Sequence, residues 1–434
     1  MLNGECGNEA GGMEVMPKCR HAIRFVILVT AAVAGCSLAA GIVTAAEQWS
    51  RFRGPNGSGV ASDGSFPAAW TEDDYLWKAP LPGRGHSSPV AWDDVIFVTV
   101  GDETSGALTL LALDAETGAE RWRTPFDSAP HSLHAANSYA SSTPVVDAER
   151  TYITWATPDS LQAAAVDRRG DVVWRRDLGP ADYKHGYGGS PIIVDDLLIV
   201  ANDHTGDSFV AALDAKTGKT RWVRPRQGGT ESYATPLVID NAGEQQIIVC
   251  SSAEGIAALS PSDGAVVWQL PGIYPARCVN SPIAANGLVF TGSGEGGNGK
   301  NLTAVKSTGA QRDANAAVAY ELNKVLPQVP TPIVVGECLF TWSDRGVVSC
   351  YDAASGDQRW TKRIGGNYFG SPVAAGGKLY GVSADGEAVA LAATDEYQLL
   401  GRSSLGEGSH ATPAIHQGKM FLRTESTLAC LPAE

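Results

Sequence analysis

Side chains suited to ligand binding recur in this sequence at one repeated position, just ahead of a Ser-Pro or Thr-Pro pair. They are aromatic, imidazole, amide and guanidinium groups, which recognise ligands by stacking and hydrogen bonding. The positions are His86, Tyr139, His185, Tyr187, Tyr233, Arg277, Asn280, Asn367, Tyr368 and His410, with His131 and His134 as further candidates. If these segments converge, the side chains form a binding site. The alternative is that they bond to neighbouring segments and only fill the interior.

Signatures of catalysis are missing from the same sequence. It has no Gly-x-Ser-x-Gly elbow, no His-Glu-x-x-His and no phosphate-binding loop. A glycine-rich stretch at 292–297 lies where a hairpin is expected, not between a strand and a helix. We interpret the acidic stretch 202–207 as a hairpin turn rather than a calcium site, because Asn and Asp bond to turn backbones. We therefore expect no catalytic residue and no metal site.

The Ser/Thr-Pro pairs themselves indicate the fold that must position the candidate residues. Successive prolines are 55, 47, 45, 46, 50, 40 and 41 residues apart, and a short apolar run follows each one. A period of this size that carries only strand signals is typical of a β-propeller. The eight pairs begin at Ser88, Thr143, Ser190, Thr235, Ser281, Thr331, Ser371 and Thr412.

A second repeated motif lies in the third strand expected for each repeat. In the first repeat it is the run 112–118, in which Asp114 and Gly118 form a tight turn and Trp122 follows. Large aromatic residues at one position of several repeats favour packing of one repeat against the next over ligand binding. The tryptophans of this kind are Trp77, Trp122, Trp174, Trp222, Trp268 and Trp360. The fifth and seventh repeats have Tyr320 and Leu399 near that position, and 307–317 is expected as an exposed loop.

The two ends of the repeat region predict how the ring closes. The eighth repeat stops after Leu431 without a fourth strand, and a spare strand signal at 75–78 precedes the first Ser-Pro. Pairing the two completes the last blade and hides both sheet edges. We therefore predict an all-β, eight-bladed propeller of four-stranded antiparallel blades as a single domain over 47–434. Seven blades would result if one degenerate repeat did not form.

The first 46 residues have the three parts of a secretory signal. Lys18, Arg20 and Arg24 precede an apolar stretch, 25–43, which ends in small residues, and cleavage after Ala46 would follow. We expect export to the periplasm or cell envelope. An uncleaved membrane anchor is one alternative; lipidation of Cys36, in a Val-Ala-Gly-Cys sequence, is another.

The net charge and the cysteine content limit which partners and which disulfide bonds we expect. A net charge of −14 argues against nucleic-acid binding, which depends on Lys and Arg. Five cysteines follow the leader, and an odd number argues against a disulfide framework in a protein that we expect to be monomeric. Cys338 and Cys350 flank one predicted hairpin and can bridge across it; the alternative is a set of buried thiols.

The third-strand units, Ala-x-Asp-x-x-(Thr/Ser)-Gly-x-x-x-Trp, resemble the tryptophan-docking repeats of the PQQ-like β-propellers, in the quinoprotein alcohol dehydrogenase-like superfamily. That superfamily includes the BamB-like lipoproteins of outer-membrane assembly. Segments 49–60, 137–144 and 185–191 resemble a planctomycete-type group of secreted proteins with such repeats. The resemblance covers about residues 49–434 and implies the propeller fold and export, not a particular activity.

For the dehydrogenases, the resemblance implies PQQ (pyrroloquinoline quinone) in the central funnel. There it stacks between a tryptophan and a disulfide of adjacent cysteines, next to a calcium ion. This sequence contains no two adjacent cysteines. A PQQ- and calcium-dependent oxidoreductase is therefore the alternative hypothesis, and no cofactor is expected in the preferred one.

The preferred hypothesis is an exported, noncatalytic binding or scaffold protein. Its partner would be a protein segment or a small ligand such as a sugar, held at the funnel mouth or along blade edges. A role in envelope assembly similar to that of BamB is its most concrete form, by analogy. A carbohydrate-binding, hydrolase or lyase propeller is the third possibility.

Overall fold

The apolar runs of each repeat form one antiparallel sheet of short strands. The structure is a computed structural model that describes residues 47–62, 64–308 and 315–434. The predicted leader, including Cys36, lies outside the described residues. In the described ranges, no helix has the length and apolar character needed to cross a membrane. Helical structure there comprises two 3₁₀ turns, η1 (Pro55–Gly57) and η2 (Glu72–Asp74).

The strands of the first half of the chain are β1 (Trp77–Pro80), β2 (Val90–Trp92), β3 (Val95–Gly101), β4 (Leu108–Asp114), β5 (Glu120–Phe126), β6 (Val145–Val146), β7 (Arg150–Ala156), β8 (Leu161–Asp167), β9 (Val172–Asp177), β10 (Ile192–Val194), β11 (Leu197–Asn202), β12 (Ser208–Asp214) and β13 (Thr220–Arg226).

The strands of the second half are β14 (Leu237–Asn241), β15 (Glu244–Ser251), β16 (Gly255–Leu259), β17 (Val266–Leu270), β18 (Ile283–Ala285), β19 (Leu288–Glu295), β20 (Asn298–Thr308), β21 (Asn315–Leu322), β22 (Ile333–Val335), β23 (Cys338–Trp342), β24 (Val347–Asp352), β25 (Gln358–Arg363), β26 (Val373–Ala375), β27 (Lys378–Val382), β28 (Glu387–Ala392), β29 (Leu399–Ser404), β30 (Ala414–His416), β31 (Lys419–Arg423) and β32 (Thr427–Pro432).

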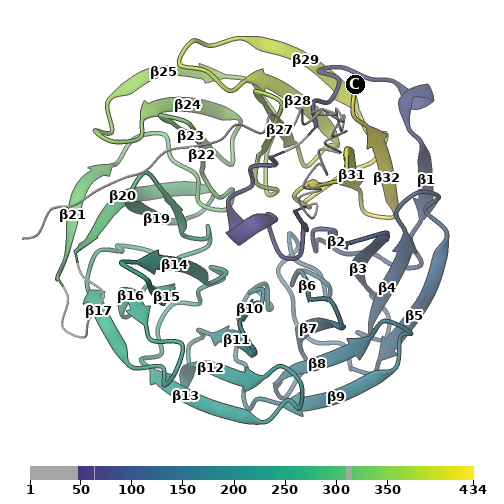
Figure 1. Ribbon diagram of the computed structural model, residues 1–434, viewed down its shortest axis with the longest axis vertical. Helices are drawn as coiled ribbons and strands as arrows, with labels where there is room; N and C mark the ends of the chain where they lie inside the picture. Colours follow the sequence, from purple (N-terminus) through teal and green to yellow (C-terminus); the bar gives the residue numbers. More distant parts are fainter. Residues whose placement is uncertain (1–46, 63, 309–314) are drawn as a thin grey trace, which may run out of the picture. The chain divides into compact units, whose positions relative to one another are not determined.

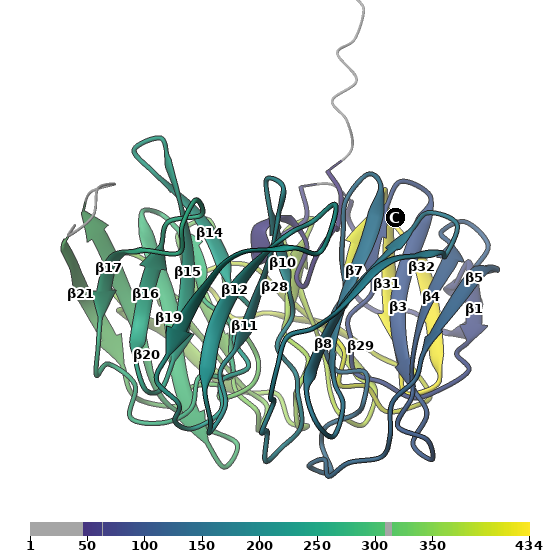
Figure 2. The same ribbon diagram turned by 90° about the horizontal axis from the view of Figure 1, so that it is seen from below.

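Eight four-stranded sheets stand side by side in a ring, and each is one blade of a β-propeller (Figures 1 and 2). Seven blades are consecutive meanders, from β2–β5 to β26–β29. The eighth has the order β1-β32-β31-β30, with Trp77 opposite Cys430 and Pro80 opposite Thr427. The predictions of eight blades and of closure by the N-terminal strand are thus confirmed, and the seven-bladed alternative is wrong.

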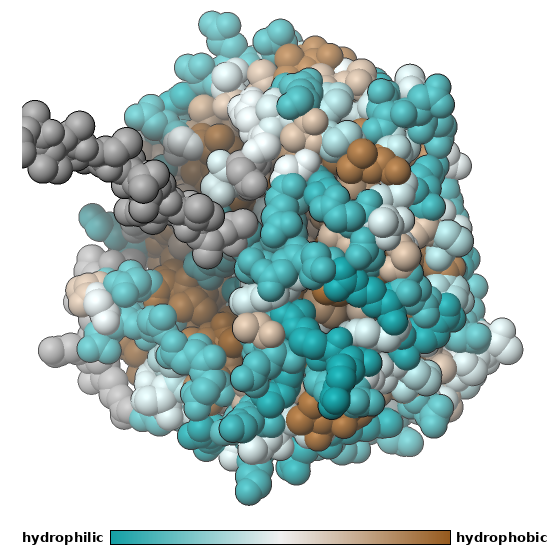
Figure 3. All heavy atoms as spheres, turned by 45° about the vertical axis from the view of Figure 1, so that its right-hand side comes forward, coloured by the Kyte–Doolittle hydropathy of each residue, from teal (hydrophilic) through white to brown (hydrophobic). Residues whose placement is uncertain are grey.

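The hydrophobic core lies between the blades, because the middle strands are covered on both faces. In β3 and β8, six of seven residues are buried, whereas four of the seven in the outer strand β5 are exposed. Figure 3 shows a mainly hydrophilic surface with scattered apolar groups. Large exposed apolar residues include Val172, Val173 and Val223 on outer strands. Burial on both faces accounts for the continuous apolar runs in the sequence.

The repeated tryptophans join each blade to the next. The Trp174 indole donates a hydrogen bond to the carbonyl of Ala215 at 2.9 Å, and its ring covers Gly218 in the turn of the following blade. A Cβ at Gly218 would lie 2.6 Å from that ring. The same donation to the next blade is made by Trp77, Trp122, Trp222, Trp360 and the Tyr320 hydroxyl.

Trp268 departs from this pattern because the fifth blade has no short turn to receive it. Its indole donates to Gln246 within its own blade at 2.9 Å. Strands β20 and β21 are long here and extend to Thr308 and from Asn315. The expectation of an exposed loop over 307–317 is therefore wrong at both ends, where the chain is paired strand. Residues 309–314 lie outside the described residues.

The Ser/Thr-Pro pairs form a second link between blades, around the central axis. The hydroxyl of one pair accepts a hydrogen bond from the backbone N–H of the pair before it, as Thr143 does from Ser88 at 3.0 Å. Seven of the eight steps carry such a bond, of 2.9–3.2 Å; at the step from Ser190 to Thr235 the described residues show none. We call these eight residues the hydroxyl ring.

The segment 49–61 runs across the centre of the propeller (purple in Figure 1). The buried Arg51 donates to the carbonyl of Pro236 at 2.5 Å, and the buried Arg53 donates to those of Pro332 at 2.9 Å and Pro372 at 3.4 Å. Backbone bonds add contacts to the first, second and seventh blades. We call this segment the N-terminal plug; the sequence did not indicate its position.

Candidate functional site

A central pocket of about 550 Å³ opens among the loops that precede the Ser/Thr-Pro pairs. All eight residues of the hydroxyl ring line it, and so does Phe52 of the N-terminal plug. The N-terminal plug is bonded to the carbonyls of prolines that directly follow residues of the hydroxyl ring. Because the plug crosses the channel there, it blocks the channel on that side of the ring. The volume lies in the range typical of small-molecule sites, roughly 300–1,000 Å³.

Five of the ten residues proposed from sequence line the pocket, namely His86, His185, Tyr233, Arg277 and His410. They come from five different inter-blade segments. His134, from the loop between the first two blades, lines it as well. Their convergence follows from the topology, because each of these loops enters the innermost strand of a blade.

The other five lie elsewhere. The Tyr139 ring packs against His131 beside a small neighbouring recess. Tyr187 is buried and donates to the Thr154 hydroxyl at 3.2 Å; the Asn280 amide is buried and donates to the Gln328 carbonyl, also at 3.2 Å. Tyr368 is buried against Trp342, with ring centroids 5.3 Å apart. Asn367 is exposed, outside the residues that line the pocket.

Further lining residues that were not proposed from the sequence include Phe52, Gln328, Asp344 and Phe369. Phe369 follows Tyr368 directly. Side chains alternate in direction along an extended segment, so the one that faces the pocket is Phe369 when Tyr368 is buried. Gln328 precedes a Thr-Pro pair and had the same signal as the predicted residues. Asp344 belongs to the hairpin between the second and third strands of its blade, and nothing in the sequence indicates that this hairpin reaches the pocket.

One side of the pocket carries two imidazoles in contact, with their ring planes tilted by 46°. The ring centroids of His86 and His410 are 4.3 Å apart, and the ring centroid of Phe369 lies 4.2 Å from that of His410. Burial, reinforced by His410, Arg423 and Arg84, lowers the pKa of His86 to about 3. Burial also lowers the pKa of His410. Both rings are therefore neutral at pH 7 and can donate or accept one hydrogen bond each.

The opposite side carries a charged cluster. Arg277 Nη1 lies 2.9 Å from His185 Nδ1 and 3.7 Å from a carboxylate oxygen of Glu231, which is buried. The Glu231 carboxylate also accepts the Lys184 backbone N–H at 2.9 Å. Burial and the Arg277 charge lower the pKa of His185 against the opposing effect of Glu231. His185 is thus a neutral acceptor for the Arg277 guanidinium.

Asp344 is the acidic residue among those that line the pocket, and its oxygens are already engaged. They accept the backbone N–H groups of Gln328 at 2.6 Å and Val329 at 3.2 Å. Burial raises the pKa of this carboxyl, while the two N–H donors oppose the rise. The carboxylate therefore holds the 328–329 loop in place rather than offering a free acceptor to a ligand.

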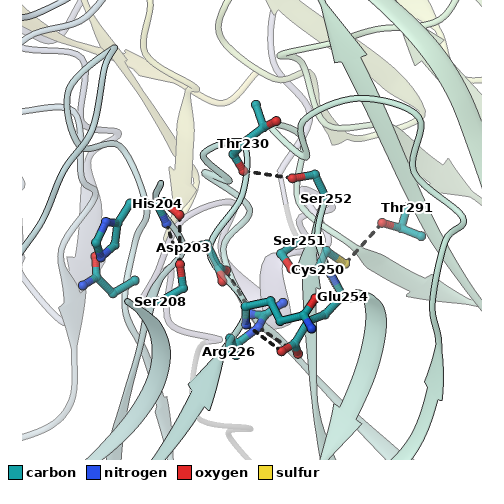
Figure 4. A network of polar contacts seen from close by, with 12 residues as sticks. Asp203, His204, Ser208, Arg226, Thr230, Cys250, Ser251, Ser252, Glu254 and Thr291 are labelled. Atoms are coloured by element: carbon teal, nitrogen blue, oxygen red, sulfur yellow. Dashed lines mark hydrogen bonds and ion pairs between the residues drawn. The ribbon is translucent and has the colours of Figure 1, made fainter. Parts of the chain in front are cut away.

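A largely buried ion cluster links the third and fourth blades (Figure 4). Arg226 Nη1 is 2.9 Å from Asp203, and Arg226 Nε is 3.5 Å from Glu254 of the next blade. Asp203 belongs to the stretch 202–207. That stretch connects two strands as expected, but Asn202, Asp203 and His204 are buried rather than exposed on a turn. Burial raises the pKa of Asp203 to about 6, although Arg226 opposes the rise.

We expect Asp203→Asn to change how stability depends on pH. Because the pKa of Asp203 is higher in the folded chain, its stabilising contribution is complete below about pH 4 and is lost as the pH rises towards 6. The free energy of unfolding of wild type minus that of the variant should fall by about 3 kcal/mol between pH 3 and pH 8. Urea denaturation at four pH values measures it. Parallel curves for the two proteins would contradict the assignment.

The side chains of the pocket do not fit the quinone and calcium that the dehydrogenase alternative requires. No tryptophan or cysteine is among the residues that line it, so the stacking partners are missing. The five described cysteines, Cys338 and Cys350 included, are buried free thiols. Within the described ranges, no group of three or more His, Cys, Asp or Glu is placed to hold a metal ion. We derive no reaction step through these groups.

The sequence of this chain matches the model of one protein family and is similar to several known proteins. A family model described as "Outer membrane protein assembly factor BamB" matches residues 68–244, 140–326 and 323–431. The protein of that name from Yersinia pestis is 27% identical over 223 residues, which cover 50% of this chain and 54% of that protein. The one from Burkholderia pseudomallei is 25% identical over 299 residues, 66% of this chain and 68% of that protein. This chain thus spans about half the length of the Yersinia relative.

Quinoproteins are also similar. The quinoprotein ethanol dehydrogenase of Pseudomonas aeruginosa is 27% identical over 196 residues, 43% of this chain and 29% of that protein. Among solved structures, BamB from Moraxella catarrhalis matches with a TM-score of 0.60 at 14% identity, covering 82% of this chain and 96% of that one. A europium-containing methanol dehydrogenase matches with a TM-score of 0.53 at 13% identity, covering 88% and 90%. At these identities the structures show the fold alone.

Proposed function

Because the chain belongs to the family described as outer membrane protein assembly factor BamB, we propose that it is an exported, noncatalytic binding protein of cell-envelope assembly. The match of that family model along residues 68–431 carries the proposal. The relatives from Yersinia and Burkholderia, whose names state a role in outer membrane protein assembly, support it. Export rests on the signal-like first 46 residues, with lipidation of Cys36 as one form of anchoring.

A binding role agrees with the chemistry at the centre of the ring. The lining residues offer hydrogen-bond donors, imidazoles and aromatic faces, while the carboxylate of Asp344 is engaged by two backbone donors. A rigid ring that presents loops around a concave centre is suited to recognition.

The partner in this proposal is a protein segment held at the pocket mouth. Exposed residues on that rim include His134 and Lys184, in the loops ahead of the second and third Ser/Thr-Pro pairs. The turns between the third and fourth strands lie at the other end of the blades, so residues there serve as controls. Lys216 and Thr220 of the third blade are exposed at that end.

The test is chemical cross-linking and affinity isolation from envelope fractions of the source organism, with partners identified by mass spectrometry. We expect wild type to recover an outer-membrane assembly component, and the rim variant His134→Glu/Lys184→Glu to lose at least ten-fold of it. The control, Lys216→Glu/Thr220→Glu, also introduces two glutamates, one of them in place of a lysine, at the opposite end and should bind as wild type does. Recovery of no envelope protein would contradict the proposal, and equal recovery by the two variants would place the partner site away from the mouth.

A further inference from the structure

The central pocket is a blind cavity with a largely apolar wall, and hydrogen-bond donors are prominent among its polar groups. The N-terminal plug blocks one side, and Phe52 provides an aromatic surface there. The hydroxyl ring surrounds the cavity. Seven of its hydroxyl oxygens accept a backbone N–H from the neighbouring blade, which leaves the O–H proton of each to be donated.

Arg277 adds a charged donor on the wall. Its side chain is 20% exposed and lines the pocket. Nη1 is engaged with His185 and Glu231, but within the described ranges Nε and Nη2 have no hydrogen-bond partner. A guanidinium edge of this kind matches the two oxygens of a carboxylate. Glu231, which offsets its charge, is almost wholly buried, so a ligand meets the arginine first.

Acceptors on the wall are few in comparison. The oxygens of Asp344 accept two backbone N–H groups, and the Gln328 side-chain oxygen accepts the Gly297 N–H at 2.6 Å. A cationic ligand would therefore meet a single carboxylate among the residues that line the pocket, and each of its oxygens already accepts a backbone N–H. The remaining surface is apolar or aromatic, and includes Phe52, Phe369 and Val279. The walls thus complement a negatively charged head joined to an apolar body.

We propose that this pocket binds a carboxylate with an apolar body, with the carboxylate on Arg277 and the hydroxyl ring and the apolar part between Phe52 and Phe369. The site deepens the proposed binding role at the same mouth. The carboxylate comes either from a free small molecule or from the C-terminus of a peptide, since both present the same two oxygens. Entry is from the mouth alone, because the plug blocks the other side.

The test uses matched acids and amides on the purified propeller, followed by isothermal titration and ligand-observed NMR. The small-molecule pair is 4-phenylbutyrate and 4-phenylbutyramide; the peptide pair is acetyl-Ala-Ala-Leu with a free or an amidated C-terminus. We expect one or both acids to bind at least ten-fold more tightly than the corresponding amide. Binding of the peptide acid alone identifies a chain terminus as the source, and binding of 4-phenylbutyrate identifies a small molecule.

Variants test the assigned contacts. Arg277→Gln/Glu231→Gln removes both charges of the buried pair together, so neither is left uncompensated, and it should weaken acid binding at least ten-fold. The control, Arg123→Gln/Glu120→Gln, makes the same changes in an exposed pair on β5 and should bind as wild type does. If neither acid binds at 10 mM, or acid and amide bind alike, the proposal is wrong, whether or not the pocket variant folds. Failure of this proposal would leave the proposed function untouched, because that is tested by the proteins recovered from envelope fractions and not by the binding of acids and amides.

Discussion

Arg53→Met is expected to lower the free energy of unfolding by about 3–4 kcal/mol, since it removes charge-assisted hydrogen bonds that contribute roughly 1.5–3 kcal/mol each. The side chain is fully buried and joins the N-terminal plug to two prolines, Pro332 and Pro372, and to Ser58. Burial lowers the pKa of Arg53 to about 9, which still leaves it charged at pH 7. Methionine fills a similar volume but leaves buried carbonyls without a donor.

Urea denaturation followed by tryptophan fluorescence measures this loss. The matched control is Arg176→Met, in which an exposed arginine on β9 is replaced and stability should change by less than about 0.5 kcal/mol. Limited proteolysis gives an independent readout, because a plug that no longer seats should be cut between residues 49 and 61. A loss under 1 kcal/mol together with an uncut plug would show that Arg53 does not hold the segment.

Gly218→Ala is expected to destabilise the propeller by about 3 kcal/mol, a cost comparable with overpacking a well-packed core. The added Cβ would lie 2.6 Å from the Trp174 ring, and it would also sit at a φ of +68°. Trp174→Ala removes the same contact from the other side, with an expected loss of about 3–5 kcal/mol. The free energy of unfolding from urea denaturation measures both.

Gly287→Ala separates the two causes. Gly287 has a φ of +76° and no atom within 4 Å of its Cβ position, so alanine there meets the backbone cost alone, about 1–2 kcal/mol. The excess loss in Gly218→Ala then measures the contact between blades. Equal losses in the two glycine variants would show that the tryptophan ring yields without cost.

The fold could be predicted because its signals are local and repeated. The Ser/Thr-Pro pairs mark each innermost strand, and the spare strand signal near Trp77 indicated the closure. In the loops that precede the Ser/Thr-Pro pairs, the direction of each side chain was harder to predict. Tyr368 and Phe369 are adjacent, and the sequence does not show which one faces the pocket. Tyr187 is likewise buried by its bond to Thr154, a residue from the preceding blade.

The N-terminal plug could not have been located by pattern. Arg51 and Arg53 bind main-chain carbonyls, which every residue possesses, so no complementary side chain marks the partner. The Asp203–Arg226–Glu254 cluster was hidden for a different reason. Its members come from two blades, and their separation in sequence carries no period. Contacts of this kind appear only when the blades are assembled in space.

The course of the chain through the N-terminal plug has a consequence for the order of folding. Residues 49–80 are synthesised before any complete blade, yet several of their partners lie much later in the chain: Pro236, Pro332 and Pro372 for the plug, and β32 for β1. Loops that join such distant residues close late. The earliest part of the propeller to be made therefore completes its contacts only when the last strand, β32, is present. Until β32 exists, the unpaired β1 is a segment that needs protection from aggregation.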